Sequence, residues 1–264
     1  MPDAIADLTA YNLSMKKSLI DKMFFMDKIG DDIKVIMDYG CADGALIRFL
    51  APLFPEITFV GYDVSEVMIG RAIAETIDDN CYFTTSLSVF NDWLNDKGWT
   101  ADQCIINLSS VIHEVYSYAI DNSVEAFWRY VSEFGFKYIV IRDMGLDESA
   151  HRSAFKEDLI KVRSHYPQDK IREFETIHGS ICDNYNLIHF LLKYRYTDNW
   201  EREVRENYLP ITVESMANHI SRDYDLVYHD HYILPFFASV VKRDFDITLK
   251  DYTHVKFIYR RKET

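Results

Sequence analysis

The stretch VIMDYGCADGALIRFL, residues 35–50, decides the fold. It begins with a mostly apolar run that predicts a buried strand, and it ends with the spacing of an amphipathic helix. Between the two, the seven positions from Asp38 to Gly44 hold two glycines, one alanine and two aspartates. A plain strand-to-helix connection needs one helix cap, so this turn indicates that a ligand approaches the backbone there.

Strands and helices alternate through the first half of the chain. This alternation predicts a parallel sheet that is covered by helices on both faces. Connections this short should be right-handed crossovers. Strands are expected at residues 33–40, 57–64, 81–87, 101–110 and 136–144, and helices at 45–54, 65–76 and 124–134.

The remaining parts of the chain have other patterns. Residues 8–29 have a helical pattern, and residues 147–220 show helical periodicity with few strand features. Residues 223–234 and 253–262 then predict two strands that flank a helix at 235–245. Because no Gly/Pro/Ser linker separates these parts, we expect one domain with a helical insert.

The composition narrows the class of protein and its partners. The chain has 264 residues and a formal net charge of −13, and an acidic surface repels phosphate backbones. Nucleic acid is therefore less expected as a partner than a small molecule, but nucleic-acid binding is not excluded. No apolar run is long enough to span a bilayer and no signal peptide is evident, so no membrane association is expected. The cysteines lack a CxxC spacing, which indicates reduced thiols in a cytoplasmic protein: Cys41, Cys81, Cys104 and Cys182.

The glycine-containing turn has an acidic partner on the next strand. In doubly wound sheets the turn after the first strand binds ligands at a helix N-terminus, and Asp63 ends the second strand, where an acid can bind both ribose hydroxyls. The turn does not fit the G-x-G-x-x-G of dinucleotide sites, and Asp38 would be unfavourable beside a pyrophosphate. A cationic nucleoside such as S-adenosylmethionine (SAM) would suit Asp38 and Asp43. The alternative is a Rossmann-like turn that binds nothing.

The two motifs VIMDYGCADG and FVGYDVS resemble the first two motifs of class I SAM-dependent methyltransferases. Asp38, Gly40 and Gly44 match the family pattern acid-x-G-x-G-x-G, Ala42 replaces its middle glycine, and Asp63 matches the ribose-binding acid. The resemblance implies an α/β fold with a doubly wound, mostly parallel seven-strand sheet whose strand 7 is antiparallel. It also implies an N-terminal helix and an α-helical insert between strands 5 and 6.

The resemblance divides the single domain, residues 1–264, into four parts. These are an N-terminal helical lid at 1–32, a SAM-binding core at 33–146, a helical insert or cap at 147–222 and a closing strand hairpin at 223–264. It implies SAM as the cofactor and S-adenosylhomocysteine (SAH) as the product. The expected cofactor-binding residues are Tyr11, Asp38, Gly40, Cys41, Ala42, Gly44, Asp63, Val64, Met68, Ser86, Leu87, Asn107, Leu108 and Ser109.

Methyl transfer needs an aligned acceptor, and a base helps where the acceptor loses a proton. His113 and Glu114 follow the fourth strand at the ligand-binding edge and are the candidate catalytic residues, although His113 could instead pack or cap a helix. Arg142 and Asp143 follow the fifth strand, where they would line the acceptor pocket or form a structural ion pair. The aromatic residues of the insert either stack on the acceptor or pack the insert, and the candidates are Tyr194 and Trp200.

A metal site is not expected. His229 and His231 share one face of a strand, but no third ligand is evident beside them. The sequence therefore predicts a SAM-dependent methyltransferase that acts on an O or N of a small molecule. Two alternatives stay open: an RNA or protein methyltransferase that works with a partner, and a non-catalytic SAM-binding regulatory module. A homodimer also stays open.

Overall fold

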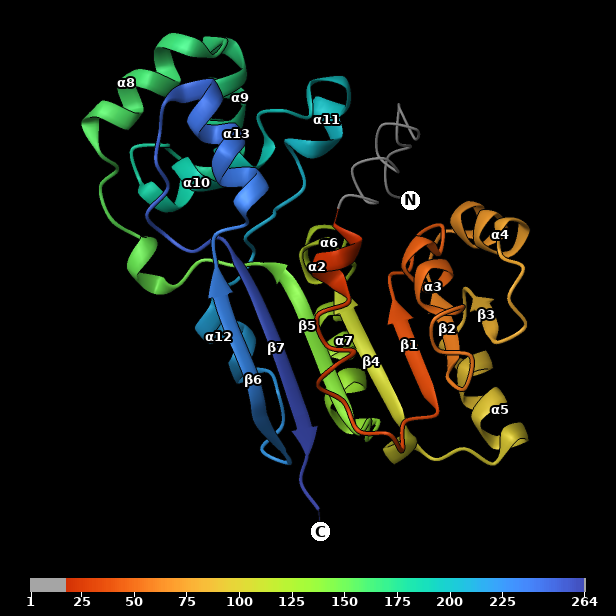
Figure 1. The fold of residues 1–264 in the computed structure, drawn as a ribbon. Coiled ribbons are helices and arrows are strands. Elements are labelled where there is room, and N and C mark those ends of the chain that lie inside the picture. The colour runs from red at the N-terminus through yellow and green to blue at the C-terminus, as the bar shows by residue number, and fades with distance from the viewer. Residues whose placement is uncertain (1–17, 264) are drawn as a thin grey trace.

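The computed structural model describes residues 18–263 and contains one seven-stranded sheet in the order β3-β2-β1-β4-β5-β7-β6 (Figure 1). All neighbouring strands are parallel except those that pair with β7, which is antiparallel to both β5 and β6. The predicted doubly wound α/β sheet with an antiparallel strand 7 is therefore confirmed. The strands are β1 Val35–Tyr39, β2 Thr58–Tyr62, β3 Cys81–Thr84, β4 Cys104–Ser109, β5 Tyr138–Met144, β6 Tyr224–Tyr232 and β7 His254–Arg261.

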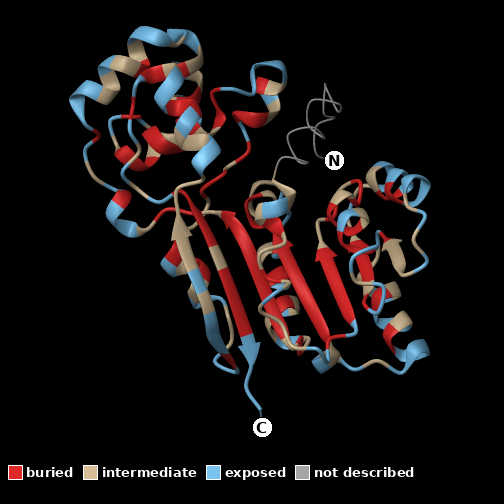
Figure 2. Cartoon of the chain, in the orientation of Figure 1, coloured by how far each residue is buried: buried red, intermediate tan, exposed pale blue. Residues whose placement is uncertain are grey.

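Helices cover both faces of this sheet because its central strands are apolar on both sides. Figure 2 shows the central strands buried along most of their length. On one face Val35 and Met37 pack with α5 and α7, and on the other Ile36 packs with α3 and α4. The helices are α2 Leu19–Lys22, α3 Ala45–Leu50, α4 Glu66–Glu75, α5 Leu87–Lys97, α6 Ile112–Ser117, α7 Ser123–Glu133, α8 Lys156–His165, α9 Gln168–His178, α10 Asn184–Lys193, α11 Trp200–Glu203, α12 Val213–Asn218 and α13 Pro235–Phe245.

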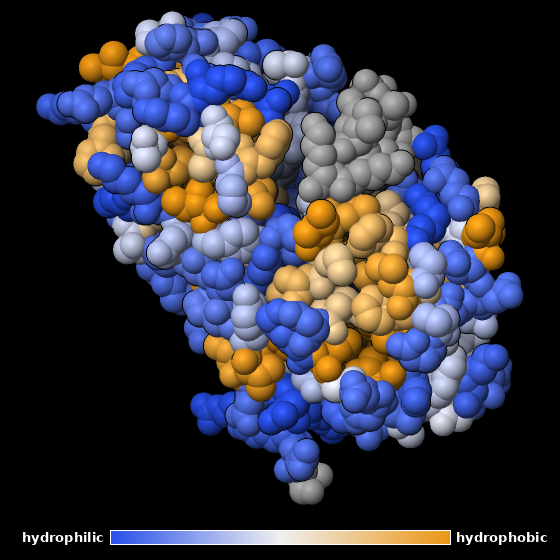
Figure 3. Space-filling model, viewed as in Figure 1, coloured by the Kyte–Doolittle hydropathy of each residue, from blue (hydrophilic) through white to orange (hydrophobic). Residues whose placement is uncertain are grey.

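The N-terminal segment differs from the long helix that its sequence predicts. Within the described residues α2 ends at Lys22, and turns follow to residue 29. The four consecutive residues Met23–Met26 are all apolar, so a helix would point them in several directions. As turns they lie flat over the sheet, where Phe25 is fully buried. Figure 3 shows an apolar surface on this face of the molecule. In the N-terminal segment itself, the side chain of Ile20 is exposed. Residues 8–17 of the predicted helix lie outside the described residues.

Two helices of the core, α5 and α6, were not predicted. The third strand ends at Thr84 rather than at residue 87, and α5 begins directly after Ser86. The hydroxyl of Thr84 accepts a hydrogen bond from the backbone N–H of Ser86 at 3.0 Å, which turns the chain out of the sheet. Phe90 and Leu94, one turn apart on α5, then bury their side chains against the sheet.

The insert between β5 and β6 forms a cap with its own apolar core. Helices α8, α9 and α10 pack around Phe174 and Phe190, which are both fully buried. As the sequence predicts, β6 and β7 pair and the helix α13 lies between them in the chain. Val240 and Val241 of α13 pack into the core of the cap. Figure 1 shows α13 among the cap helices, at the end of the sheet where β5 finishes. None of the described helices is long and apolar enough to cross a membrane.

Candidate functional site

The turn after β1 adopts a conformation that needs glycine. Gly40 and Gly44 have φ of 78° and 76°. The backbone N–H groups of Gly40 and Cys41 both donate to the carbonyl of Tyr62, at 2.7 and 2.9 Å, which holds the turn against the end of β2. A Cβ atom at Gly40 would lie 2.4 Å from a methyl carbon of Val111. The backbone at Gly40 is therefore closely packed on its Cβ side.

Asp63 joins this turn to the end of β2. One carboxylate oxygen accepts a hydrogen bond from the N–H of Ala42 and the other from the N–H of Ser65, each at 2.9 Å. Burial raises the pKa of Asp63, and these two N–H groups partly offset that effect. Each oxygen keeps a lone pair for a further donor, so the carboxylate can accept two hydroxyl groups.

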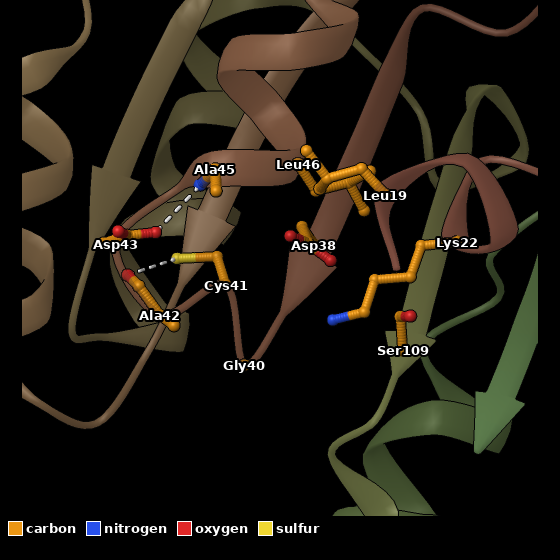
Figure 4. Close-up of a pocket in the computed structure, with 10 residues that line it drawn as sticks. All are labelled: Leu19, Lys22, Asp38, Gly40, Cys41, Ala42, Asp43, Ala45, Leu46 and Ser109. Carbon is orange, nitrogen blue, oxygen red and sulfur yellow. Dashed lines mark hydrogen bonds between the residues drawn. The ribbon is translucent and has the colours of Figure 1, made fainter. Parts of the chain in front are cut away.

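A pocket opens beside the turn, and its polar groups carry opposite charges (Figure 4). Asp38 is buried at the end of β1, where burial raises its pKa to about 6 while its carboxylate accepts a 2.8 Å hydrogen bond from the amide of Asn107. Lys22 reaches in from α2, and burial lowers the pKa of its ammonium group to about 8. The hydroxyl oxygen of Ser109 is buried here without a hydrogen-bond partner among the described residues. An unpaired buried hydroxyl beside two buried charges points to a polar ligand.

The other expected cofactor residues fall into two groups. Val64 is 69% exposed at the mouth of the cleft, and Ser86 and Leu87 begin α5 at the same edge of the sheet. Met68 lies in the first turn of α4, where its N–H donates to the hydroxyl of Ser65 at 3.3 Å. The side chains of Cys41 and Leu108, by contrast, point into the two apolar cores. Leu108 is fully buried, whereas Cys41 also lines the pocket beside the turn. Tyr11 lies outside the described residues.

His113 lies between the core and the cap. Its Nδ1 donates to the Asp143 carboxylate at 2.8 Å, and its Nε2 lies 3.4 Å from the Glu206 carboxylate. Burial opposes the charged imidazole, but the two carboxylates outweigh it and raise the pKa of His113 to about 10. The two carboxylates therefore favour the protonated imidazole, which accepts no proton, and the general-base role of His113 stays a prediction.

Glu114 is partly exposed, and its carboxylate lies beside Arg202. Its side chain is 36% exposed, and its carboxylate oxygen lies 3.7 Å from the guanidinium group of Arg202. Desolvation and the nearby charge of Glu206 raise the pKa of Glu114 to about 7. The buried ammonium group of Lys193 donates to the backbone carbonyls of Glu203 and Glu206, which fixes the turn that carries Glu206.

Arg142 and Asp143 are occupied by contacts within the chain. Arg142 donates to Ser110 at 2.9 Å and to Asp21 at 2.8 Å, and Tyr232 donates to the same Asp21 carboxylate at 2.7 Å. Asp143 accepts hydrogen bonds from the N–H of Ile112, at 2.9 Å, and from His113. The structure therefore favours the ion-pair interpretation over an acceptor-lining role. Asp21 ties α2 to the sheet, and this positions the adjacent Lys22 in the pocket.

The aromatic residues expected at the acceptor pocket pack the cap instead. Tyr194 and Trp200 are 6% and 4% exposed in the core of the cap. The hydroxyl of Tyr194 donates to Asp244 at 2.6 Å, and the indole N–H of Trp200 donates to Glu173 at 2.7 Å. Their polar atoms are satisfied inside the cap, so neither side chain faces the cleft.

The two strand histidines also have structural partners. His229 stacks on Phe257 with the ring centroids 4.9 Å apart, and Nε2 of His231 donates to the carbonyl of Gly145 at 3.1 Å.

Four residues of the site were not predicted from the sequence: Lys22, Asp21, Arg202 and Glu206. The sequence showed Lys22 on the polar side of the predicted N-terminal helix. No pattern in the sequence near Glu206 or His113 indicated that these two side chains meet.

Comparison with known proteins shows the class of fold. No protein-family model and no curated protein matches the chain. Among solved structures, a SAM-dependent methyltransferase from Anabaena variabilis ATCC 29413 is 13% identical with a TM-score of 0.50, and the match covers 99% of this chain and 97% of that one. The plantazolicin methyltransferase BamL, solved with a triazolic desmethylPZN analog and SAH, is 14% identical with a TM-score of 0.48 over 96% of this chain and 88% of that one. The methyltransferase domain of bacterial CtHen1 is 13% identical with a TM-score of 0.45 over 95% and 100%.

At these identities the likeness concerns the fold alone. The chain has the fold of the class I SAM-dependent methyltransferases, with the strand order and the antiparallel strand 7 described above.

Proposed function

We propose that this protein is a SAM-dependent methyltransferase. One observation carries the proposal: three features meet at the carboxyl edge of β1, β2 and β4. They are the glycine turn, the Asp63 carboxylate, and the pocket lined by Asp38, Lys22 and Ser109. Ligands of open α/β sheets bind at this edge. The chemistry of SAM fits these groups, because it combines a ribose with a zwitterionic methionine and a sulfonium, and it has no phosphate.

Each residue of the pocket then has a role in binding. Asp63 accepts hydrogen bonds from the two ribose hydroxyls. Asp38 binds the ammonium group of the methionine, and its negative charge also attracts the sulfonium. Lys22 binds the methionine carboxylate. The unpaired hydroxyl of Ser109 supplies a further hydrogen bond to this end of the ligand. SAM would supply the methyl group on sulfur, and the chain's task is to hold an acceptor in line with it.

The acceptor side lies between α6 and the turn that carries Glu206. Here His113 and Glu114 of the core meet Arg202 and Glu206 of the insert. The cap contacts the core at this point, and the chain is acidic overall. These features favour a small-molecule acceptor over a nucleic acid.

Calorimetry with SAM and SAH tests the cofactor, with NAD as the control ligand. Both sulfur nucleosides should bind to the wild type, and Asp63→Ala should bind them far more weakly. Asp92→Ala removes an exposed acid on α5 and is the matched control, which should bind as the wild type does. Failure of the wild type to bind SAH would contradict the proposal. Binding without methyl transfer across an acceptor screen would favour a regulatory module, and salt-sensitive RNA binding would favour an RNA methyltransferase.

A further inference from the structure

Three potential metal ligands converge where the core meets the insert. They are Nε2 of His113 and the carboxylates of Glu114 and Glu206, and one ligand atom from each lies within 4.8 Å of the others. Ligand atoms on opposite sides of one ion are about 4.2 Å apart, since Zn–N and Zn–O distances are about 2.1 Å. Glu114 has a partly exposed side chain, so a small movement of its carboxylate brings the set to bonding distance.

The histidine is oriented as metal-binding histidines are. Asp143 accepts the hydrogen bond from Nδ1 of His113 at 2.8 Å, and its other oxygen accepts from the N–H of Ile112 at 2.9 Å. This outer carboxylate fixes the ring so that Nε2 faces the two glutamates. A carboxylate–histidine pair of this kind raises the basicity of the coordinating nitrogen.

Burial opposes the charge on the Glu206 carboxylate, but the positive groups of His113, Arg202 and Lys193 outweigh it and lower the pKa of Glu206. Its side chain is 2% exposed, yet its contacts are long: 3.4 Å to Nε2 of His113 and 3.5 Å to the guanidinium group of Arg202. Arg202 also stands 3.7 Å from Glu114, and its own Nε has no hydrogen-bond partner among the described residues. A buried carboxylate normally has short, charge-assisted hydrogen bonds. The geometry therefore lets a cation take the place of the proton on Nε2 of His113, within reach of both glutamates.

We propose that His113, Glu114 and Glu206 bind one divalent cation, with Asp143 as the outer partner of the histidine. One imidazole and two carboxylates form a mixed N/O set, which suits Mn²⁺, Fe²⁺ or Zn²⁺ better than a thiophilic ion. Arg202 lies beside the two glutamates and balances part of their charge.

The role of the ion rests on the proposed function. An acceptor hydroxyl that binds the ion as a further ligand becomes more acidic and releases its proton to solvent. Its oxygen then forms the new bond to the methyl carbon, the carbon–sulfur bond breaks, and the sulfonium becomes the thioether of SAH. His113 and Glu114 thus act as ligands that place the acceptor, and not as bases.

Mn²⁺ titration of chelator-treated protein tests the site, with free Mn²⁺ followed by electron paramagnetic resonance at physiological ionic strength. The wild type should bind one ion per chain, with nitrogen coupling from an imidazole ligand. The double variant Glu114→Gln/Glu206→Gln should lose this site. Asp143→Asn should weaken it about 10–100-fold. Glu203→Gln is the matched control, because Glu203 also contacts Arg202 but lies outside the ligand set, and its Mn²⁺ affinity should not change.

Two results would overturn the metal site. One is a wild type that binds no stoichiometric Mn²⁺ or Zn²⁺, and the other is unchanged binding in the double variant with no nitrogen coupling. Thermal unfolding of each variant shows that it is folded. SAH calorimetry on the same chelator-treated samples separates the two proposals: SAH binding without Mn²⁺ binding removes the metal site alone, and Mn²⁺ binding without SAH binding removes the proposed function.

Discussion

Replacement of Gly40 by alanine should destabilise the protein for two separable reasons. A non-glycine residue at a φ of 78° costs about 1–2 kcal/mol. The new Cβ would also lie 2.4 Å from Cγ2 and 3.0 Å from Cβ of Val111, a branched residue buried in the core, so overpacking adds about 1–3 kcal/mol. The free energy of unfolding should therefore fall by about 2–5 kcal/mol.

Two other glycines provide controls that isolate each contribution. Gly98 ends α5 with a φ of 66°, and no atom lies within 4 Å of the point that a Cβ would occupy there. Gly98→Ala should therefore cost only the backbone contribution, about 1–2 kcal/mol. Gly70 lies inside α4 with the same open surroundings and no positive φ, so Gly70→Ala should stabilise the protein by about 0.5–1 kcal/mol.

A double-mutant cycle with Val111→Ala isolates the steric contribution. Shortening Val111 removes the atom that the new methyl group meets, so Gly40→Ala should cost about 1–3 kcal/mol less in the Val111→Ala background than in the wild type. Urea unfolding followed by circular dichroism measures all these values. The reasoning is refuted if Gly40→Ala costs no more than Gly98→Ala, or if its cost is the same in both backgrounds.

Three further predictions concern the pocket, the lid and the cap. Because burial raises the pKa of Asp38 from 3.8 to about 6, the native state binds this proton more tightly than the unfolded chain, and stability falls as the pH rises through this range. Asp38→Asn should thus raise the free energy of unfolding at pH 7.5 by about 1–3 kcal/mol and change it little at pH 4. The same variant should bind SAH more weakly. A variant that is less stable than the wild type at pH 7.5 would contradict this reasoning. Asp21→Asn loosens α2 and should weaken SAH binding about tenfold while adenosine, which lacks the methionine, binds as before. Tyr194→Phe loses the hydrogen bond to Asp244, so its free energy of unfolding, measured by thermal unfolding, should fall by about 1 kcal/mol. A changed KM for an acceptor would instead place Tyr194 at the acceptor pocket.

The sheet could be predicted from the sequence because its information is local. The apolar runs at Val35–Tyr39 and Tyr138–Met144 are bounded by turn residues, and the helix at Pro235–Phe245 begins with a proline that suits a first turn. The Asp38–Gly44 turn and Asp63 belong to one strand–helix–strand unit, so their meeting at one edge of the sheet follows from the spacing.

The acceptor side could not be predicted, because it depends on contacts between distant parts of the chain. His113 was visible as a candidate, but its two carboxylate partners come from β5 and from the insert. Those partners fix the orientation of its ring and raise its pKa. Trp200 and Tyr194 show the same limit: aromatic residues in a helical insert look alike in sequence, whether they face a ligand or the interior of the cap.

The position of α13 has a consequence for protein engineering. The cap is discontinuous in sequence, because the stretch between β5 and β6 and the helix between β6 and β7 share one core. A graft of the first stretch alone into another scaffold of this fold would leave behind Val240, Val241 and Phe245, which are all buried against it. Recombination that aims to exchange the cap therefore has to move both segments together. Crossover points within β6 would separate two halves that fold against each other.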